Sequence, residues 1–376
     1  MEWLGTFWQS RDFEVGLGQP IYAALTGAGV PGWLVSILYP VVGAATILGI
    51  ITVSVMMALW LERKGLARMQ DRYGPNRVGP FGLGQSPADV VKLLSKEVIT
   101  PRGVDRLLHY LGPILVLSPS LLMWAVVPWG PGLQVADLNV AVLYLVAFGS
   151  IPVLGITLAG WGSNNKYSLL GGMRAVVQYV SYEVPAALTL VIPVLLAGTL
   201  SLQGIVSAQS GPFWNWFIFK PIIVFPVLGI AAFVLYLIGG LAEANRTPFD
   251  HVEADSELVA GFQTEYAGMQ WALFMLAEYG NSIAISLLGS TLFLGGYHTG
   301  LGDWFDDLIW PLLPGVLATK AAVIFAIFVW IRGSLPRFRY DQLMGFAWKR
   351  MLPAALFLIS VTAVLAPWIR SVPVAR

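Results

Sequence analysis

Six carboxylates crowd one stretch of the chain, residues 243–268, around a single arginine. They are Glu243, Asp250, Glu253, Asp255, Glu257 and Glu265, and the arginine is Arg246. A helix that begins near Asp250 places Asp250, Glu253 and Glu257 on one face and points Asp255 elsewhere. Part of this pattern is structural, because Asp250-x-x-Glu253 after a proline also fits a capping box. Buried neighbouring carboxylates raise each other's pKa and titrate together. These carboxylates are therefore candidates for accepting and passing protons near neutral pH.

Three further ionisable residues, Glu183, Glu278 and Lys320, lie inside long apolar stretches. A charge at the centre of a bilayer costs about 2.5–3.5 kcal/mol on insertion scales, so such residues usually face a polar interior and mark an ion path. The alternative is structural pairing, for example of Lys320 with a carboxylate. Carboxylates at several depths beside an acidic connection favour a chain of proton carriers over a single pair.

The elements that hold these residues are predicted to be membrane helices. The chain is 57% hydrophobic and 11% charged, whereas a soluble domain has about 45–50% apolar and about 25% charged residues. It has no cysteine and only three histidines, which excludes thiolate-bound iron–sulfur clusters and disulfides and argues against haem. We expect an all-α polytopic membrane protein that carries no cofactor of its own.

Crossing about 30 Å of hydrocarbon takes about 20 apolar residues in a helix. About eight stretches qualify: 33–61, 107–128, 140–160, 174–197, 219–242, 269–297, 311–332 and 351–369. They predict one transmembrane domain over 34–370, with cytoplasmic loops at 62–106, 161–173, 243–268 and 333–350. Residues 1–33 form a separate N-terminal segment, in which 15–25 could lie at the interface, and no cleavable signal peptide is expected.

Most of the 22 Lys and Arg residues fall in the first, third, fifth and seventh connections between these stretches. Positive charge marks the cytoplasmic side. Both termini are therefore expected on the opposite side, which requires an even number of spans.

The first connection, 62–106, is basic and contains two Gly-Pro turns. Residues 88–97 within it have apolar side chains at Val90, Val91, Leu93 and Leu94 and polar ones at Asp89, Lys92 and Lys96. This pattern is consistent with an amphipathic interfacial helix. Two interpretations stay open: a basic loop held at anionic headgroups, and a docking platform for a soluble partner.

Motifs in these connections resemble one known family. They include Arg72-Tyr73-Gly74-Pro75-Asn76, Val78-Gly79-Pro80-Phe81-Gly82-Leu83, Ser163-Asn164-Asn165-Lys166-Tyr167-Ser168, Asn245-Arg246-Thr247-Pro248-Phe249-Asp250, Ala277-Glu278-Tyr279 and Pro336-Arg337-Phe338-Arg339-Tyr340-Asp341. The chain resembles the quinone-site membrane subunit of proton-pumping NADH:quinone oxidoreductase, the respiratory complex I family. The matched motifs run from residue 62 to about 348.

The resemblance implies a membrane anchor that helps form the quinone chamber and couples quinone reduction to proton translocation. Quinone would be the substrate; the partners would be the other membrane and hydrophilic subunits and the lipid bilayer, with no nucleic acid. The implied location is a bacterial plasma membrane. The implied quinone entrance comprises Glu62, Arg63, Arg72, Phe81, Arg246 and Phe262. The implied proton-coupling set comprises Glu183, Glu243, Asp250, Glu253, Asp255, Glu257, Glu265, Glu278 and Lys320.

The sequence departs from the family pattern after Asp250, where it reads His251-Val252. We interpret His251 as an exposed residue with no role in the chemistry. Two other functions stay open. One is the equivalent anchor of a membrane-bound hydrogenase or ferredoxin-fed complex. The other is a stand-alone transporter, which the lack of self-similarity between the two halves disfavours.

Overall fold

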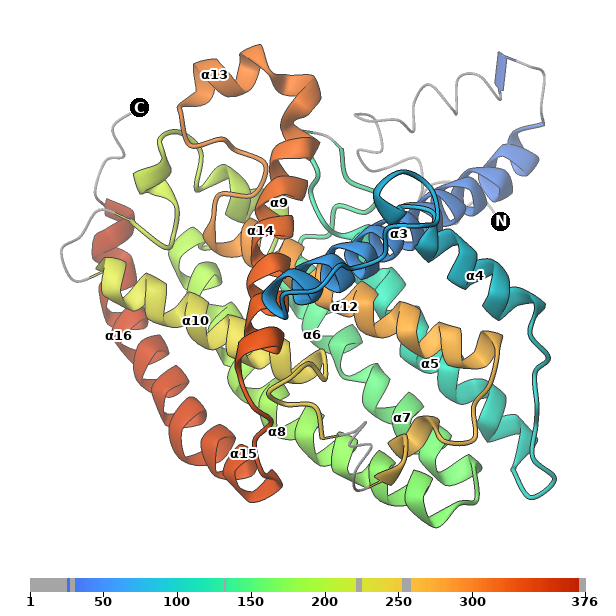
Figure 1. Cartoon of the computed structure of the whole chain (residues 1–376). Helices are drawn as coiled ribbons and strands as arrows, with labels where there is room; N and C mark the ends of the chain where they lie inside the picture. Colours follow the sequence, from blue (N-terminus) through green and yellow to red (C-terminus); the bar gives the residue numbers. More distant parts are fainter. Residues whose placement is uncertain (1–25, 28–30, 132, 221–224, 252–257, 372–376) are drawn as a thin grey trace.

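The computed structural model describes residues 26–27, 31–131, 133–220, 225–251 and 258–371, and within them the regular structure is helical (Figure 1). The elements in chain order are α3 Gly32–Met69, η1 Pro80–Gly82, α4 Gln85–Ser95, α5 Arg106–Ala125, α6 Ala141–Gly149, α7 Ile151–Gly162, α8 Lys166–Ala197, α9 Leu202–Ser207, η2 Phe213–Asn215, α10 Phe225–Glu243, η3 Gly261–Gln263, α12 Met269–Phe293, α13 Asp303–Leu308, η4 Trp310–Leu312, α14 Leu313–Ser334, α15 Tyr340–Phe346, η5 Ala347–Met351 and α16 Leu352–Ser371. The predicted all-α class is confirmed.

Seven helical stretches in the described part are long and apolar enough to cross a membrane. They are α3, α5, α6 with α7, α8, α12, α14, and the run from α15 into α16. The predicted span 219–242 corresponds to α10, a shorter apolar helix. The chain is thus a polytopic membrane protein, while the number eight and the side of the termini stay predictions.

Several helices continue beyond the apolar stretches that predicted them. Helix α3 extends to Met69, so Glu62 and Arg63 lie on a helix rather than in a loop. Helix α8 begins at Lys166, where the Asn165 side chain accepts a hydrogen bond from the Tyr167 amide, so the expected loop 161–173 shrinks to 163–165. Most of the expected loop 333–350 is likewise helical. A helix satisfies its own backbone in water as in lipid, so apolar content locates its membrane part and not its ends.

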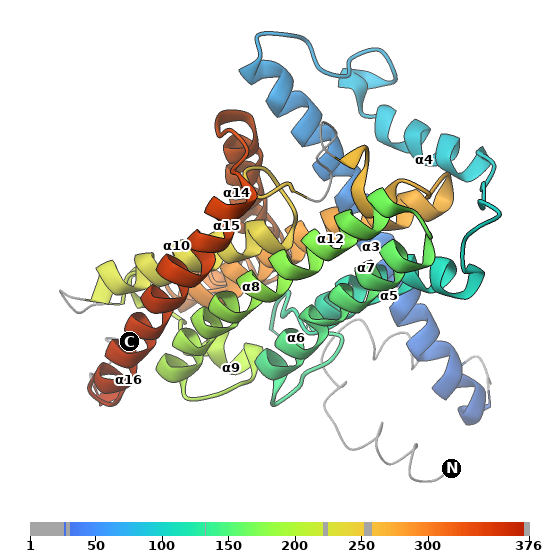
Figure 2. The same ribbon diagram turned by 90° about the horizontal axis from the view of Figure 1, so that it is seen from below.

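Figures 1 and 2 show α12 running through the middle of the bundle. It contacts α3, α5, α10 and α14, and its apolar window is the most deeply buried of the seven candidate spans. In Figure 1, α9 and α13 lie at one end of the bundle, and α15 and the turn between α7 and α8 lie at the other. The central helix therefore connects the two sides of the membrane.

Small residues bring the outer helices close to this core, as is usual between membrane helices. A Cβ atom added at Gly171 of α8 would lie 2.5 Å from the Cα of Gly261, at the start of η3. The same addition at Gly345 of α15 meets nothing within 4 Å. Gly171 thus sets the distance between α8 and the connection that leads into α12.

We expect Gly171→Ala to lower the stability of the protein in detergent by about 1–3 kcal/mol, because overpacking forces backbone apart. Alanine favours a helix over glycine by about 1 kcal/mol, so the sign of the effect separates packing from helix propensity. The measurement is a thermal melt of the purified protein, with Gly345→Ala as the control expected to be neutral or stabilising. A Gly171→Ala variant as stable as Gly345→Ala would show that this contact relaxes freely.

Candidate functional site

Four charged side chains from four parts of the chain meet in a buried ion network. Arg246 Nη1 donates to both carboxylate oxygens of Glu62, at 3.0 Å and 3.2 Å, and its Nε lies 3.0 Å from Glu278 Oε1. Arg332 at the end of α14 binds Glu62 from the other side. Arg246 and Glu62 have side chains that are only 5% and 6% exposed. The two positive and two negative charges balance, and the Arg246–Glu62 pair is screened from bulk water, whereas the Arg332 side chain at the edge of the network is 34% exposed.

Local backbone geometry places Arg246 at the centre of this network. Helix α10 ends at Glu243, and Asn245 adopts a left-handed backbone (φ 49°), a conformation that asparagine tolerates better than most residues. The chain thereby folds back, and the Arg246 amide donates to Leu241 O. The guanidinium lies over the ring of Tyr279, 3.8 Å from its centroid. Burial by itself lowers the pKa of Arg246, but the carboxylates of Glu278 and Glu62 raise it above the ordinary value, so it stays charged.

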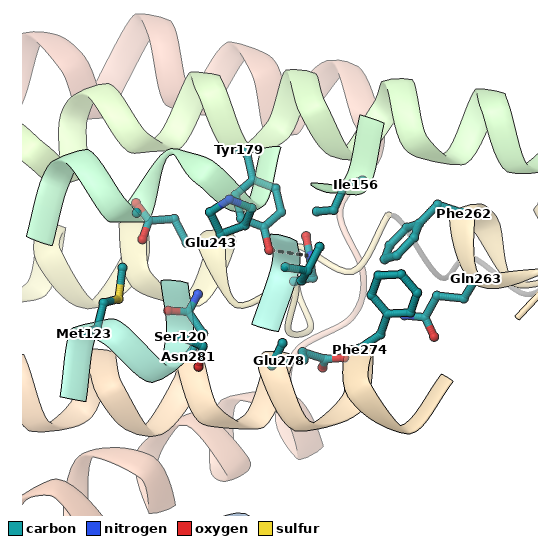
Figure 3. A pocket seen from close by; sticks show the side chains of 15 residues that line it. Ser120, Met123, Ile156, Tyr179, Glu243, Phe262, Gln263, Phe274, Glu278 and Asn281 are labelled. Carbon is teal, nitrogen blue, oxygen red and sulfur yellow. Dashed lines mark hydrogen bonds between the residues drawn. The ribbon is translucent and has the colours of Figure 1, made fainter. Parts of the chain in front are cut away.

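A cavity lined by both polar and apolar side chains adjoins the network (Figure 3). Its volume is about 40 Å³, measured as the space open to the centres of water molecules. A water molecule needs about 10–15 Å³ on this measure, so about three would fit. Its lining is Val116, Ser120, Met123, Gly149, Pro152, Ile156, Tyr179, Glu243, Asn245, Phe262, Gln263, Phe274, Ala277, Glu278 and Asn281. Among the described residues the buried Ser120 Oγ finds no hydrogen-bond partner, which fits a cavity that holds water.

Three of the predicted proton-coupling carboxylates gather around this cavity. Glu278 lines it from α12 and Glu243 from α10, with Tyr179 between them in Figure 3. Glu183 lies one turn after Tyr179 on α8, interacts electrostatically with Glu243 and accepts a hydrogen bond from the Ser150 hydroxyl. Ser150 lies at the junction of α6 and α7, two residues before Pro152.

Polar side chains connect these carboxylates. The Asn245 amide donates to the Tyr179 hydroxyl at 3.1 Å, and Tyr179 interacts electrostatically with both Glu278 and Glu243. Glu278 belongs to the cavity and, through Arg246, to the ion network. A change of charge on one of these groups alters its electrostatic interactions with the others. The arrangement can therefore receive a proton at one end and redistribute charge along its length.

Of the remaining predicted proton-coupling residues, Asp250, Glu265 and Lys320 do not join this group. Asp250 pairs with Arg337 at 3.1 Å, and Glu265 accepts a hydrogen bond from the Asn165 side chain at 2.6 Å. Lys320 lies near the far end of α12 and donates to backbone carbonyls rather than to a carboxylate. Glu253, Asp255 and Glu257 fall outside the described residues.

The predicted quinone-entrance residues separate into a buried and an exposed set. Glu62 and Arg246 belong to the ion network, and Phe262, 4% exposed, lines the cavity. Arg63 lies at the surface and pairs with Asp89 of α4 at 2.6 Å. The other two are also exposed: the Arg72 guanidinium donates to Gln70 Oε1 at 2.8 Å, and Phe81 is 73% exposed.

The interpretation of His251 as an exposed residue is wrong. It is 4% exposed and lies edge-on to the ring of Tyr340, the first residue of α15. The approach of a helix from nearly ninety residues later in the chain covers it, and local sequence carries no sign of that contact.

Several residues of the site were not predicted, namely Ser120, Ser150, Tyr179, Asn245, Gln263, Asn281 and Arg332. Arg332 offered a signal, since it is a basic residue in the last turn of a membrane helix. Asn245 offered another, as the neighbour of the only arginine in the acidic stretch. The other uncharged residues gave none, because serine, tyrosine and amide side chains occur throughout the chain.

These features define an integral, multi-pass membrane protein of the class that keeps ionisable side chains inside its helical bundle. The family model described as NADH dehydrogenase matches residues 42–363. The H subunit of NADH-quinone oxidoreductase from Dehalococcoides mccartyi strain 195 is 44% identical over 331 residues, which are 88% of this chain and 87% of the relative. The protein of the same name from strain CBDB1 is 43% identical with the same coverage. The chain therefore belongs to the family of NADH-quinone oxidoreductase H subunits, as the resemblance of its motifs implied.

Proposed function

We propose that this chain is the membrane subunit of an NADH-quinone oxidoreductase that forms part of the quinone chamber and couples quinone reduction to proton translocation. The observation that carries the proposal is the double role of Glu278. It pairs with the buried Arg246, and together with Glu243 it lines the cavity. A change of charge at the ion network would thereby reach the carboxylates inside the membrane.

Quinone reduction takes up two electrons and two protons to form the quinol. The electrons would come from partner subunits, since this chain has no cysteine to hold an iron–sulfur cluster. Negative charge that develops on the quinone favours protonation of nearby carboxylates. A proton on Glu278 weakens its pair with Arg246, and Glu62 then holds the guanidinium. Because coupling free energies are reciprocal, the state of the cavity also affects the quinone site.

The exposed segment after α3 suits the entrance and the contact with other subunits. Tyr73 and Phe81 are 87% and 73% exposed, and the Trp60 indole donates to Phe81 O at 3.2 Å. Helix α4 follows, with Val91 and Leu94 exposed on it. In this proposal soluble subunits and lipid cover that surface, and the complex resides in a bacterial plasma membrane.

The test removes one polar group from the lining of the cavity and keeps the shape of the side chain. Asn281→Leu replaces a polar lining residue by one of similar shape, so water in the cavity loses a hydrogen-bond partner. We expect NADH–quinone turnover and proton translocation by the reconstituted complex to fall about threefold, while NADH oxidation by artificial acceptors persists. The magnitude corresponds to about 0.7 kcal/mol, within the range of one hydrogen bond.

Met123→Leu is the matched control, because it exchanges one apolar lining residue for another of similar volume. It should leave turnover unchanged. Equal turnover in Asn281→Leu and Met123→Leu complexes would show that the hydration of this cavity has no part in coupling.

A further inference from the structure

The ammonium group of Lys320 lies in a cage of backbone carbonyls. Its Nζ donates to Leu294 O at 2.6 Å, to Gly296 O at 3.0 Å and to His298 O at 2.6 Å. The three acceptors belong to the connection that follows α12, whereas Lys320 belongs to α14. An ammonium has three N–H donors, and each of them has an acceptor here.

An aromatic ring and two glycines complete the cage. The Trp216 ring lies 4.1 Å from Lys320 Nζ, within the range of a cation–π contact. Trp216 also packs against Gly295 and Gly300, which have φ values of 74° and 80°. A Cβ at Gly300 would lie 2.7 Å from Trp216 Cζ2, and one at Gly295 would collide with the indole nitrogen. These positions thus require glycine both for the backbone turn and for the ring.

The cage also closes the C-terminal end of α12. Carbonyls at the end of a helix have no partner within it and carry partial negative charge. Leu294 is the residue that follows the last turn of α12, and its carbonyl is one of the three that bind the ammonium. A neutral amine would keep only two donors and direct a lone pair at a carbonyl oxygen. The three carbonyl oxygens therefore match the three donors of an ammonium group.

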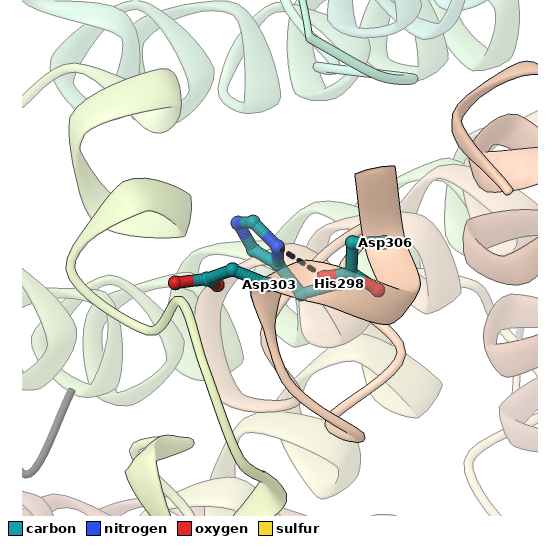
Figure 4. A group of neighbouring side chains, drawn as sticks. All are labelled: His298, Asp303 and Asp306. Atoms are coloured by element: carbon teal, nitrogen blue, oxygen red, sulfur yellow. Dashed lines mark hydrogen bonds and ion pairs between the residues drawn. The ribbon is translucent and has the colours of Figure 1, made fainter. Parts of the chain in front are cut away.

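The far rim of the cage is fixed to α13 (Figure 4). His298 Nδ1 lies 2.8 Å from Asp306 Oδ2, and Asp306 Oδ1 accepts hydrogen bonds from the amide and the hydroxyl of Thr299. The ligand atoms of His298, Asp303 and Asp306 lie within 4.8 Å of one another. Since Asp303 is exposed and Asp306 is already bound on both oxygens, the cation that this region is built around is the Lys320 ammonium.

We propose that the backbone of residues 294–298 and the Trp216 ring form a site for a primary ammonium group, which the chain fills with its own Lys320. Lys320 is then a fixed positive charge that ties α12 to α14 at the end opposite the Arg246 network, and not a proton carrier. This role is independent of the proposed function, because it concerns the anchoring of a helix and not the quinone reaction.

The test uses Lys320→Ala, which removes three carbons and the nitrogen and so leaves room for n-propylammonium. We expect the thermal midpoint of the purified complex to fall by about 4 °C. Millimolar n-propylammonium should restore at least half of the loss. Tetramethylammonium at the same ionic strength should restore none, because it has no N–H donor.

Two controls make the outcome decisive. Lys349→Ala removes an exposed lysine and should change neither the midpoint nor its response to amines. Lys320→Met fills the space without a charge, so its midpoint should fall and should not recover with n-propylammonium. If the Lys320→Ala complex does not accumulate, Lys320→Arg is compared with Lys320→Met, and the variant that keeps the charge should accumulate more.

Several results would overturn the proposal. One is a normal midpoint in Lys320→Ala and Lys320→Met together with lost proton translocation, which is the behaviour of a carrier. Another is a midpoint that n-propylammonium and tetramethylammonium restore equally. Equal accumulation of the Arg and Met variants would also contradict it.

Discussion

Replacing Arg246 by methionine is expected to remove most of the protein from the membrane in its folded form. The change leaves the carboxylates of Glu62 and Glu278 facing each other across a buried, uncharged side chain. Breaking a buried ion pair from one side costs about 3–5 kcal/mol, a large part of the roughly 5–15 kcal/mol that stabilises a typical domain. The measurement is the amount of folded chain in detergent-solubilised membranes and its thermal midpoint.

Arg339→Met is the control for Arg246→Met. Arg339 also pairs with a carboxylate, Asp341, but their side chains are 76% and 60% exposed. Exposed ion pairs contribute little to stability because water and salt screen them, so this variant should accumulate normally. If Arg246→Met and Arg339→Met lose comparable amounts of folded protein, burial does not determine how much the ion network contributes to stability.

A double variant separates charge from shape. In Arg246→Met with Glu278→Gln the lost cation is matched by a lost anion, while Glu62 keeps Arg332. We expect the double variant to be more stable than Arg246→Met alone. If the stability losses of the two single variants simply add in the double variant, Arg246 stabilises the protein through its packing on Tyr279 and not through its charge.

The sequence was sufficient for the fold because hydropathy reports the medium in which a helix lies. Hydropathy did not locate the helix ends, because helices α3 and α8 continue beyond their apolar stretches, to Met69 and from Lys166. The break between α6 and α7 was also invisible, although Pro152 marks it in retrospect. The hydrogen bond from Ser150 to Glu183 was hidden as well, because Glu183 lies on another helix, α8.

The site was only partly predictable because its residues converge from distant parts of the chain. Glu183 and Glu278 stand out as carboxylates in apolar helices, and both lie in the site. Glu62 and Arg332 are separated by 270 positions, and nothing local relates them. The partners of Asp250 and Glu265 were equally hidden, since an acidic stretch does not reveal that Arg337 and Asn165 bind them.

Glu243→Gln is expected to lower quinone-linked turnover to less than about a tenth of the wild-type rate, since positioned acid–base groups contribute about 10²–10⁴-fold to proton transfer. Glutamine keeps the size and hydrogen bonding of Glu243 and removes only its titration. Unlike Glu278, Glu243 has no ion pair with Arg246 to lose, so the complex should assemble. The measurements are NADH–quinone turnover, proton translocation in vesicles, and NADH oxidation by an artificial acceptor.

Glu265→Gln is the matched control for Glu243→Gln, because it makes the same chemical change in the same acidic stretch but outside the cavity. Glu265 accepts a hydrogen bond from Asn165, and the glutamine oxygen can replace that acceptor. Its turnover should stay within about twofold of wild type. The hydrogen bond from Asn165 would only change from a charged to a neutral acceptor, which is a small effect. If the Glu243→Gln complex assembles, reduces quinone and translocates protons like Glu265→Gln, then Glu243 serves only to shape the cavity, and the proton path must avoid it.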